Sequence, residues 1–307
     1  MENDKLICIS VIITAYNRKE FLLNAINSVL NQTLDKKYYE VIVIKNFEDK
    51  NIDDFINRNH MKQILMDGTI GDFLYNGVSV GNGEILVFLD DDDLFAEDKL
   101  EVVLNRFKAN NNLCYYHNDH ITINDEYKQL IANVDNSIVF NLSSISINKN
   151  ILNTDNLKQI KTNPDDFMYL SALESDKIII NGKEKLTYYM RHHSASNNLS
   201  DNFEGYGKFI ITTSNLFLNT YIFFDSLVHT KKAIKFLNSQ KTGMQIYKYI
   251  FGASEFPPNL INYIINSSGS LKYRLAFFLA CLLIKVYPQS RKYISYKVWD
   301  IHSIRSN

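Results

Sequence analysis

Apolar residues follow two different spacings in turn along the first 110 residues of the chain. Three short runs are apolar at nearly every position and rich in β-branched residues, which predicts strands buried on both faces of a sheet at residues 8–14, 40–45 and 85–89. Elsewhere apolar residues recur every three or four positions, which predicts helices that begin after Asn17, near Ile70 and near Ala96. This alternation is typical of a doubly wound α/β sheet, whose ligands bind at the carboxyl ends of the strands.

Local signals predict where these helices begin and end. Asn17, followed three residues later by Glu20, resembles a capping pair at the start of the first helix. The second helix is expected to stop at or before Gly83, and the third to run from Ala96 to Ala109.

The pattern changes after residue 110. Residues 113–117 and 143–147 are strand-like, and with 161–173 they give a region of mixed α and β character. Beyond about Asn202 the pattern is mostly helical, with few turn signals until Pro257-Pro258 and 267–270. We therefore expect an α/β domain followed by a helical C-terminal extension.

The composition is that of an ordinary globular protein. With 46% apolar residues among 307, the chain can bury a substantial core. A formal net charge of -1 argues against a dedicated nucleic-acid-binding protein. The three cysteines are too few and too far apart to indicate a disulfide framework or a zinc site, and residues 1–5 show no signal-peptide pattern. We expect a cytoplasmic protein that binds no nucleic acid.

Four consecutive acids, Asp90, Asp91, Asp92 and Asp93, directly follow the third predicted strand. If the extended geometry continues past the strand, Asp90 and Asp92 face one direction and the other two face elsewhere. Two carboxylates about 5 Å apart repel by roughly 3 kcal/mol, so the cluster needs a cation, raised pKa values or hydrogen-bond donors. Oxygen ligands favour Mg²⁺ or Mn²⁺. The alternative is a solvated loop that supplies acids to a helix N-terminus.

Two segments carry a resemblance to a known family. SVIITAYNR (10–18) is similar to the opening strand and nucleotide-contacting turn of the family 2 glycosyltransferases, and GEILVFLDDDD (83–93) resembles their Gly-Glu, strand and Asp-x-Asp-Asp signature. The resemblance covers roughly residues 8–196. It implies a GT-A fold and an inverting transfer of a sugar from a nucleoside diphosphate donor to a hydroxyl acceptor, a glycan or a lipid-linked saccharide, with Mg²⁺ or Mn²⁺.

The resemblance also implies roles for individual residues on the donor side. Asp92 would be a metal ligand, and the nucleotide sugar would be bound by Thr14, Ala15, Tyr16, Asp90 and Asp91. The alternative for Thr14 and Tyr16 is a plain strand-to-helix turn. The family usually carries an acidic pair after its second strand, whereas this chain reads Lys45-Asn46-Phe47-Glu48-Asp49. Asn46 can still hydrogen-bond a base through its amide, and the identity of the base stays open among uridine, guanosine and thymidine.

On the acceptor side, NPDDFMYL resembles the family's acidic pair at the start of a helix. Asp166 aligns best with the catalytic base and Asp165 stands beside it, although acids after Pro164 are also typical of a helix N-terminus. YYMRHHSAS (188–196) resembles the family's closing segment, in which Arg191 would bind phosphate and His193 would complete the metal site.

The resemblance and the helical pattern beyond about Asn202 together divide the chain into three parts. Residues 1–120 would form the nucleotide-sugar-binding half of the GT-A domain, 121–202 the acceptor-binding half, and 203–307 a helical region that contacts a membrane or another protomer. The apolar run 275–284 is too short to cross a bilayer, which takes about 20 residues. Cations and aromatic residues surround it across 272–299, as in a membrane-surface helix on the cytoplasmic face. A buried helix or a homodimer contact is the alternative.

Three other functions share part of this pattern. An Asp-nucleophile phosphatase places its acids after the first strand, and a sugar nucleotidyltransferase needs a Gly-rich phosphate loop that we do not find near the N-terminus. The altered segment 45–49 leaves a third alternative open, a non-catalytic nucleotide-sugar-binding or scaffold protein with the same fold.

Overall fold

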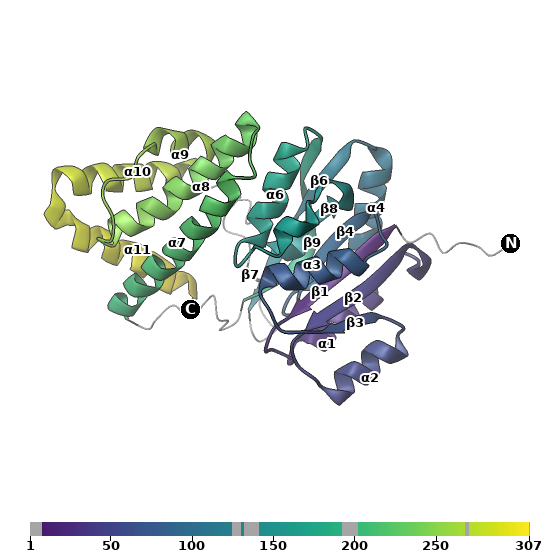
Figure 1. Cartoon of the computed structure of the whole chain (residues 1–307). Coiled ribbons are helices and arrows are strands. Elements are labelled where there is room, and N and C mark those ends of the chain that lie inside the picture. The colour runs from purple at the N-terminus through teal and green to yellow at the C-terminus, as the bar shows by residue number, and fades with distance from the viewer. Residues whose placement is uncertain (1–7, 125–129, 132–140, 192–201, 268–269, 307) are drawn as a thin grey trace. The chain divides into compact units, whose positions relative to one another are not determined.

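The computed structural model of the chain describes residues 8–124, 130–131, 141–191, 202–267 and 270–306. These residues form two compact units, one ending at Arg191 and the other comprising the described residues from Asn202 onward (Figure 1).

The first unit is built on one mixed sheet. Its strands, among the residues described, are β1 (Ile9–Ala15), β2 (Tyr39–Lys45), β3 (Lys62–Leu65), β4 (Ile85–Asp90), β5 (Leu94–Phe95), β6 (Leu113–Asn124), β7 (Leu130–Ile131), β8 (Ile145–Asn148) and β9 (Ile178–Arg191). They pair in the order β3-β2-β1-β4-β8-β6-β9-β5, with β7 pairing β6. The pairs among β3, β2, β1 and β4 are parallel, as is β6 with β9, while β8 and β5 run antiparallel to their neighbours.

Helices and helical turns connect these strands. They are α1 (Leu22–Leu30), η1 (Lys36–Tyr38), α2 (Lys50–Arg58), α3 (Ile70–Val80), α4 (Lys99–Ala109), η2 (Leu142–Ser144), η3 (Lys149–Ile151), α5 (Thr154–Leu157) and α6 (Pro164–Glu174).

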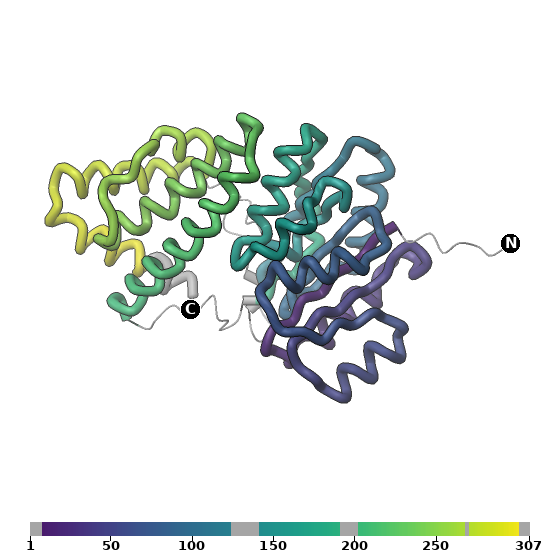
Figure 2. The backbone as a smooth tube through the Cα atoms, viewed as in Figure 1, coloured from purple at the N-terminus to yellow at the C-terminus, as the bar shows by residue number. Residues whose placement is uncertain are grey.

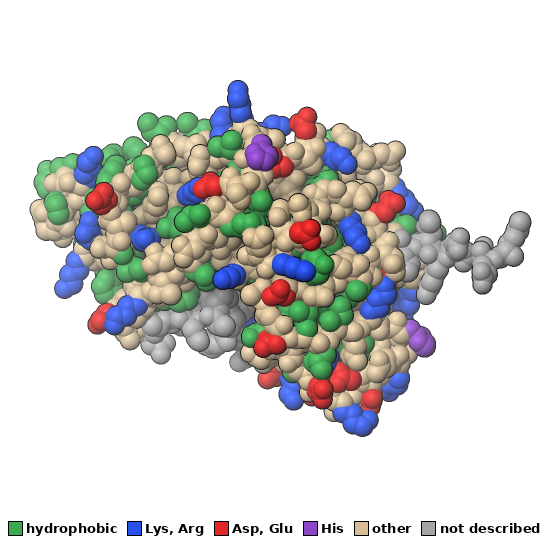
Figure 3. All heavy atoms as spheres, viewed as in Figure 1, with side chains coloured by type: hydrophobic (Ala, Val, Ile, Leu, Met, Phe, Trp, Pro, Cys, Tyr) green, Lys and Arg blue, Asp and Glu red, His purple; other side chains and the backbone are tan. Residues whose placement is uncertain are grey.

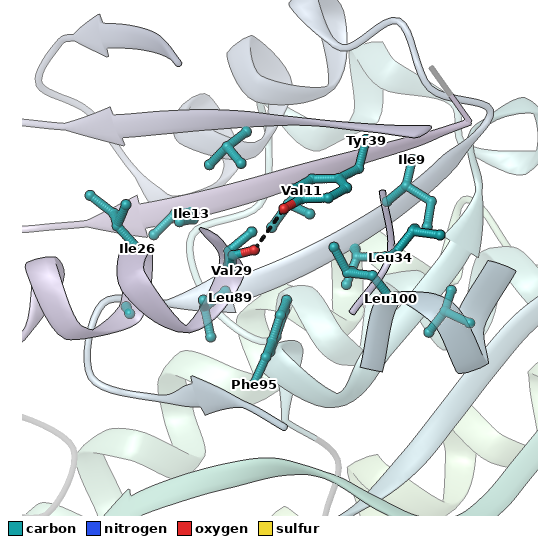
Figure 4. Close-up of a cluster of buried hydrophobic side chains, with 14 of the residues drawn as sticks. Ile9, Val11, Ile13, Ile26, Val29, Leu34, Tyr39, Leu89, Phe95 and Leu100 are labelled. Atoms are coloured by element: carbon teal, nitrogen blue, oxygen red, sulfur yellow. Dashed lines mark hydrogen bonds between the residues drawn. The ribbon is translucent and has the colours of Figure 1, made fainter. Parts of the chain in front are cut away.

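The main core lies on the face of the sheet that α1, α2 and α4 cover. Every residue of β1 is buried, and alternate ones pack against the apolar stripes of these helices, as residues on one face of a strand do (Figure 4). Within it the Tyr39 hydroxyl donates a hydrogen bond of 3.0 Å to the Val29 carbonyl. α3 packs on β1 and β2 through their other face, so closely that a Cβ at Gly77 would lie 2.7 Å from Ile12. β1, β2 and β4 are therefore covered on both faces, as their continuous apolar runs predicted, whereas β3 at the edge of the sheet is only partly buried.

The strand order creates a switch point between β1 and β4. From β1 the chain moves outward through β2 to β3, then returns across the other face through α3 to β4, on the opposite side of β1. The connections leaving the carboxyl ends of β1 and β4 therefore diverge, and such a crevice is where open α/β sheets bind ligands.

The prediction of a capping pair at Asn17 and Glu20 was wrong. α1 begins at Leu22 after Phe21, which makes no side-chain cap. Asn17 instead adopts a left-handed backbone with φ of 57°, and the Glu20 carboxylate accepts the N–H of Lys19. The predicted helix from Ala96 begins at Lys99, because Leu94 and Phe95 pair with β9 before the chain can turn.

The second unit is helical, as expected beyond Asn202. It contains α7 (Phe203–Asp225), α8 (Lys231–Ile250), α9 (Leu260–Asn266), α10 (Leu271–Val286), η4 (Pro288–Ser290) and α11 (Arg291–Ser306). α7 and α8 pack side by side as a hairpin (Figure 2), and α8, α9 and α10 share a small core around Ile246, Cys281 and Ile284. No described helix is both long and apolar enough to span a membrane.

Candidate active site

The four acids lie at the switch point of the sheet. Thr14, near the end of β1, is in register with Asp90, the last residue of β4. The residues that follow these two strands therefore leave the sheet at the same edge, where the sequence predicted that ligands bind.

The acids do not alternate between two sides as expected. β4 ends at Asp90, and the N–H of Asp93 donates to the Asp90 carbonyl at 3.2 Å, which closes a turn. The turn brings carboxylate oxygens of Asp90, Asp92 and Asp93 within 4.8 Å of one another. The expected grouping was wrong for Asp93, because the extended geometry on which it depended stops at Asp90.

Arg18 holds the two middle acids. One guanidinium nitrogen lies 2.5 Å from Asp91 Oδ1 and the other 2.7 Å from Asp92 Oδ2. Asp91 is buried, with 3% of its surface exposed, so it faces Arg18 rather than solvent. The sequence pattern indicated no role for Arg18, although Arg18 is the last residue of the segment SVIITAYNR (10–18).

A buried polar network holds the turn that carries Asp90, Asp91, Asp92 and Asp93. The Ser143 hydroxyl accepts the N–H of Asp90 at 3.0 Å, and Asp93 Oδ1 accepts the N–H of Met190 at 3.0 Å. The fully buried Lys99 donates to the Ser143 carbonyl and, at 3.0 Å, to the Thr187 hydroxyl. The turn is thereby fixed to η2, α4 and β9, and the alternative of a solvated acidic loop is excluded for Asp91 and Asp93, which are both buried.

Burial and mutual repulsion oppose ionisation of these acids. Burial, followed by the charges of Asp93, Asp92, Asp91 and Asp165, raises the pKa of Asp90 well above its usual range. Burial raises the pKa of Asp91 to about 7 although Arg18 opposes the shift. Burial and then Asp92 raise the pKa of Asp93 to about 7, and burial lowers the pKa of Lys99. The cluster therefore carries more negative charge than its surroundings neutralise.

The donor set fits a divalent cation. Asp93 Oδ2 is buried and accepts no hydrogen bond from the described residues, so it has lone pairs to spare for a cation. All the converging groups are carboxylates, the ligands that Mg²⁺ and Mn²⁺ prefer. The four acids outnumber the two basic residues beside them, Arg18 and Lys99. A divalent ion would neutralise the remaining negative charge.

The metal-free protein is expected to lose stability as the pH rises from about 4 to about 7. Asp91 and Asp93 have folded-state pKa values of about 7, above the usual unfolded value of about 3.9, so the folded state binds more protons across this window. His120, whose pKa burial lowers, acts in the opposite direction. The measurement is therefore the melting temperature against pH for the wild type compared with Asp93→Asn, with a chelator present.

We expect the wild-type melting temperature to fall by several degrees more than that of Asp93→Asn between pH 5 and pH 7.5. Mn²⁺ should then stabilise the wild type more at pH 7.5 than at pH 5, because protons compete with the ion. Equal slopes for the two proteins would show that Asp93 is not held protonated in the fold.

The acidic pair of α6 lies close to the cluster. Asn163 enters the helix with a left-handed φ of 55°, so Asn163 and not either acid is the N-cap, and Asp165 and Asp166 occupy the first turn. Asp165 lies near enough for its charge to raise the pKa of Asp90, and burial, with Asp166, raises the pKa of Asp165 to about 7. Asp166 is 7% exposed. Two acids from α6 and the acids after β4 therefore share one region.

The predicted base-contacting residues form a connected edge. Asn46, directly after β2, accepts the backbone N–H of Asn17 at 2.7 Å and donates to its side chain at 2.8 Å. Tyr16 is half exposed and packs its ring edge against Phe73 of α3, with centroids 6.0 Å apart. Lys45 is buried against Asp53 at 2.7 Å. The unusual segment after β2 thus anchors the turn after β1, and its lysine is directed inward.

The closing motif lies largely outside what the structure describes. Arg191 is the last residue of β9, and its side chain is not among those described. His193 also lies outside the described residues. β9 nevertheless runs toward the cluster, because Met190, its penultimate residue, donates its N–H to Asp93.

Sequence reasoning missed the residues that support the acids. Lys99 carried a usable signal, since it stands four residues before Val103 and eight before Phe107 on the buried stripe of α4, where an unpaired lysine is costly. Ser143 carried none, because its contact with Asp90 depends on how β8 joins the sheet.

Comparison with known proteins gives the family. Residues 10–168, about half of the chain, match the family model "Glycosyl transferase family 2". An uncharacterized glycosyltransferase of Rickettsia bellii is 35% identical over 127 residues, covering 40% of this chain and 18% of that protein. The poly(ribitol-phosphate) beta-N-acetylglucosaminyltransferase TarP of Staphylococcus aureus is 34% identical over 110 residues, covering 34% of each. The aligned regions thus span about a fifth and a third of these relatives.

Solved structures share the fold at low identity. TarS of Staphylococcus aureus, spanning 1–349 in complex with UDP-GlcNAc, has a TM-score of 0.55 at 11% identity and covers 98% of this chain and 93% of that chain. The mannosyltransferase PcManGT of Pyrobaculum calidifontis, in complex with GDP-Man and Mn²⁺, has a TM-score of 0.55 at 12% identity and covers 97% and 86%. These matches confirm the predicted GT-A fold with a helical C-terminal part. By its family model the chain belongs to glycosyl transferase family 2.

Proposed function

We propose that this glycosyltransferase is an inverting, metal-dependent hexosyltransferase that moves a sugar from a nucleoside diphosphate donor to a hydroxyl group of a glycan or lipid-linked acceptor. The observation that carries the proposal is the convergence of Asp90, Asp92 and Asp93 at the switch point of the sheet, with Asp165 close by. Such a site combines a cation position with a second acid, as transfer from a diphosphate leaving group requires.

On the donor side, Asp92 and His193 would hold Mg²⁺ or Mn²⁺, and Asp93 adds a carboxylate that the sequence did not suggest. When bound, the ion would supply positive charge to the departing diphosphate. Thr14 and Ala15 are buried, so they would meet the nucleotide through backbone groups, while the half-exposed Tyr16 offers its ring. Asn46 would donate a hydrogen bond to the base through the side-chain N–H that is not bonded to Asn17.

The remaining donor-side residues would act together. Asp90 would contact the nucleotide sugar, and Arg191 would bind phosphate oxygens with its planar guanidinium. Asp91 would serve by orienting Arg18, to which it is paired. PcManGT carries GDP-Man and TarS carries UDP-GlcNAc, so neighbours of the same fold differ in base, and we keep the base open.

On the acceptor side, Asp166 would take the proton of the attacking hydroxyl, with Asp165 beside it. Asp165 has a pKa raised to about 7 by burial and by Asp166, which suits a group that gains and loses protons near neutral pH. The charge repulsion between Asp165 and Asp90 supports a single reaction centre shared by donor and acceptor. We assign 1–120 to the donor half, 121–202 to the acceptor half and 203–307 to the helical region.

One assay distinguishes the proposal from its alternative, which is a scaffold protein that binds nucleotide sugars without turnover. A panel of uridine, guanosine and thymidine diphosphate sugars is screened for thermal stabilisation with and without Mn²⁺, since ligands that bind only the folded state raise the melting temperature. A transferase should then hydrolyse the stabilising donor slowly without an acceptor. Metal-dependent stabilisation without any hydrolysis or transfer would favour the scaffold.

Arg18 provides a prediction about metal affinity. Its guanidinium pairs with Asp92, a proposed metal ligand, and so competes with the ion for the same carboxylate. Arg18→Met is expected to bind Mn²⁺ alone about tenfold more tightly, because one unit of positive charge leaves the site. The affinity is measured by titration calorimetry or by the electron paramagnetic resonance signal of free Mn²⁺.

Lys19→Met is the matched control, because the neighbouring Lys19 pairs with Asp49 and, among the described residues, with none of the four acids. Its Mn²⁺ affinity should equal that of the wild type. An Arg18→Met protein that binds Mn²⁺ no better than the wild type would mean that Arg18 does not compete for the site.

We also propose a cytoplasmic location, with the C-terminal unit in contact with the membrane surface. A homodimer through the same unit is the competing arrangement.

A further inference from the structure

The C-terminal unit exposes an unusually apolar helix face. α10 points Cys281 and Ile284 into the core of the unit, while its other side presents aliphatic residues at helical spacing. Five of these are between 37% and 66% exposed, and on α9 two isoleucines one turn apart are each 68% exposed. We call these seven side chains the α9–α10 apolar face: Ile261, Ile265, Leu275, Leu279, Leu282, Leu283 and Val286.

Figure 3 shows hydrophobic side chains gathered over the end of this unit where α9 and α10 lie. A surface helix of a globular protein normally turns charged residues outward, and here that side is mostly aliphatic between Lys272 and Lys285. Contiguous apolar surface of this kind marks an interaction site.

The charge around this face has one sign. Residues 256–299 contain six lysines and arginines and no aspartate or glutamate, in a chain whose net charge is -1. Lys272 opens the exposed side of α10 and Lys285 closes it, and Lys292 is exposed on α11. Three tyrosines of the same stretch are also 47% to 66% exposed, namely Tyr287, Tyr293 and Tyr296. The exposed side of α10 thus combines aliphatic side chains with a lysine near each end, and exposed tyrosines follow it along the chain.

We infer that the α9–α10 apolar face docks on an anionic lipid bilayer, with α10 lying in the headgroup region and not crossing the membrane. Insertion of a leucine face with flanking lysines is how interfacial helices bind, and each basic residue near an anionic surface strengthens binding about fivefold. A second copy of the chain is a poorer occupant. A two-fold contact through the same face would bring the cations of both copies together with no acid from 256–299 to offset them.

This inference is independent of the proposed transfer reaction, because the face belongs to the helical unit and contains none of the site residues. Loss of membrane binding should leave hydrolysis of a soluble donor unchanged. Loss of the metal site should in turn leave membrane binding unchanged, so the two proposals fail separately.

The test is flotation of the full-length protein with vesicles of phosphatidylcholine alone or mixed with phosphatidylglycerol. We expect binding to the mixed vesicles at low salt, and weaker binding as salt rises and screens the charges. Leu279→Glu with Leu283→Glu should weaken binding at least about tenfold, because two leucines leave the bilayer and two charges enter it. Ile222→Glu on α7 is the matched control, since Ile222 is 66% exposed on another helix of the unit.

A second pair of variants tests the charge. Lys272→Glu with Lys292→Glu should weaken binding to the mixed vesicles at least about tenfold. The control, Lys235→Glu, removes an exposed lysine of α8 and should change binding far less. Because all these side chains face solvent, the melting temperature is expected to stay within a few degrees of the wild type, which separates lost binding from lost folding.

Three outcomes would overturn the inference. The first is no binding to either vesicle type at low salt, and the second is equal binding to neutral and anionic vesicles. The third is a concentration-dependent dimer in sedimentation that Leu279→Glu dissociates while vesicle binding is unaffected, which would assign the face to a second copy.

Discussion

Asp92→Ala is expected to lower metal-dependent turnover of the nucleotide-sugar donor by a factor of about a thousand. The Asp92 carboxylate converges with those of Asp90 and Asp93 and also pairs with Arg18. Its removal therefore takes away one oxygen ligand of the metal and leaves the Arg18 guanidinium without that partner. Positive charge at a departing diphosphate is worth several kcal/mol, which corresponds to a loss of this size. Turnover is followed as release of the nucleoside diphosphate over a range of Mn²⁺ concentrations.

Asp98→Ala is the control for this experiment. Asp98 is a neighbouring exposed acid at the start of α4 whose side chain makes no capping hydrogen bond, so its loss should change turnover little. If Asp92→Ala retained turnover within tenfold of the wild type at saturating donor, Asp92 would not be a metal ligand and the donor-side assignment would have to be abandoned.

Asp166→Asn is expected to stop transfer to the acceptor while donor affinity stays within about threefold of the wild type. The amide keeps the size of the carboxylate and cannot take a proton, so the change removes the base without reshaping α6. A general base contributes about 100-fold to 10,000-fold, and we expect a loss in this range. Donor affinity comes from thermal shift or calorimetry, and transfer from product formation.

Two further variants make the assignment specific. Asp155→Asn changes an exposed acid in the first turn of another helix, α5, and should leave transfer unchanged. Asp165→Asn decides which acid of the pair matters, since Asp165 is the one whose charge reaches Asp90. Full transfer activity in Asp166→Asn combined with loss in Asp165→Asn would move the base to Asp165.

The sheet could be predicted from the sequence because burial dictates its residues. β1, β2 and β4 are apolar at nearly every position, since both faces of a parallel sheet are covered by helices, and this leaves a direct trace in the sequence. Their boundaries were predicted to within two residues. The position of the acids followed as well, because they come directly after one of these strands.

The local shape of the acidic turn could not be predicted in this way. Alternation along an extended chain failed at Asp93, because the turn closed by its N–H and the Asp90 carbonyl ends the strand geometry. The ion pairs of Arg18 and the hydrogen bonds of Ser143 join residues 44 or more positions apart, so they depend on the strand order. No local pattern reports such contacts.

The C-terminal unit illustrates the same limit. Helical spacing predicted helices beyond Asn202 and the strongly apolar run 275–284, and the structure has both. Which side of α10 would be buried was not predictable, because apolar residues occupy both sides of the helix. Only the packing of Cys281 and Ile284 against α8 and α9 identifies the exposed side.

The central claim is that a divalent cation binds the carboxylates that follow β4. The most direct measurement is anomalous X-ray scattering from crystals of the protein grown with Mn²⁺ and a nucleoside diphosphate. A single manganese peak in contact with Asp92 and at least one of Asp90 and Asp93, with the diphosphate on its far side, is the predicted result. A bound nucleotide with no manganese at these carboxylates, and Arg18 still paired with Asp92, would contradict it.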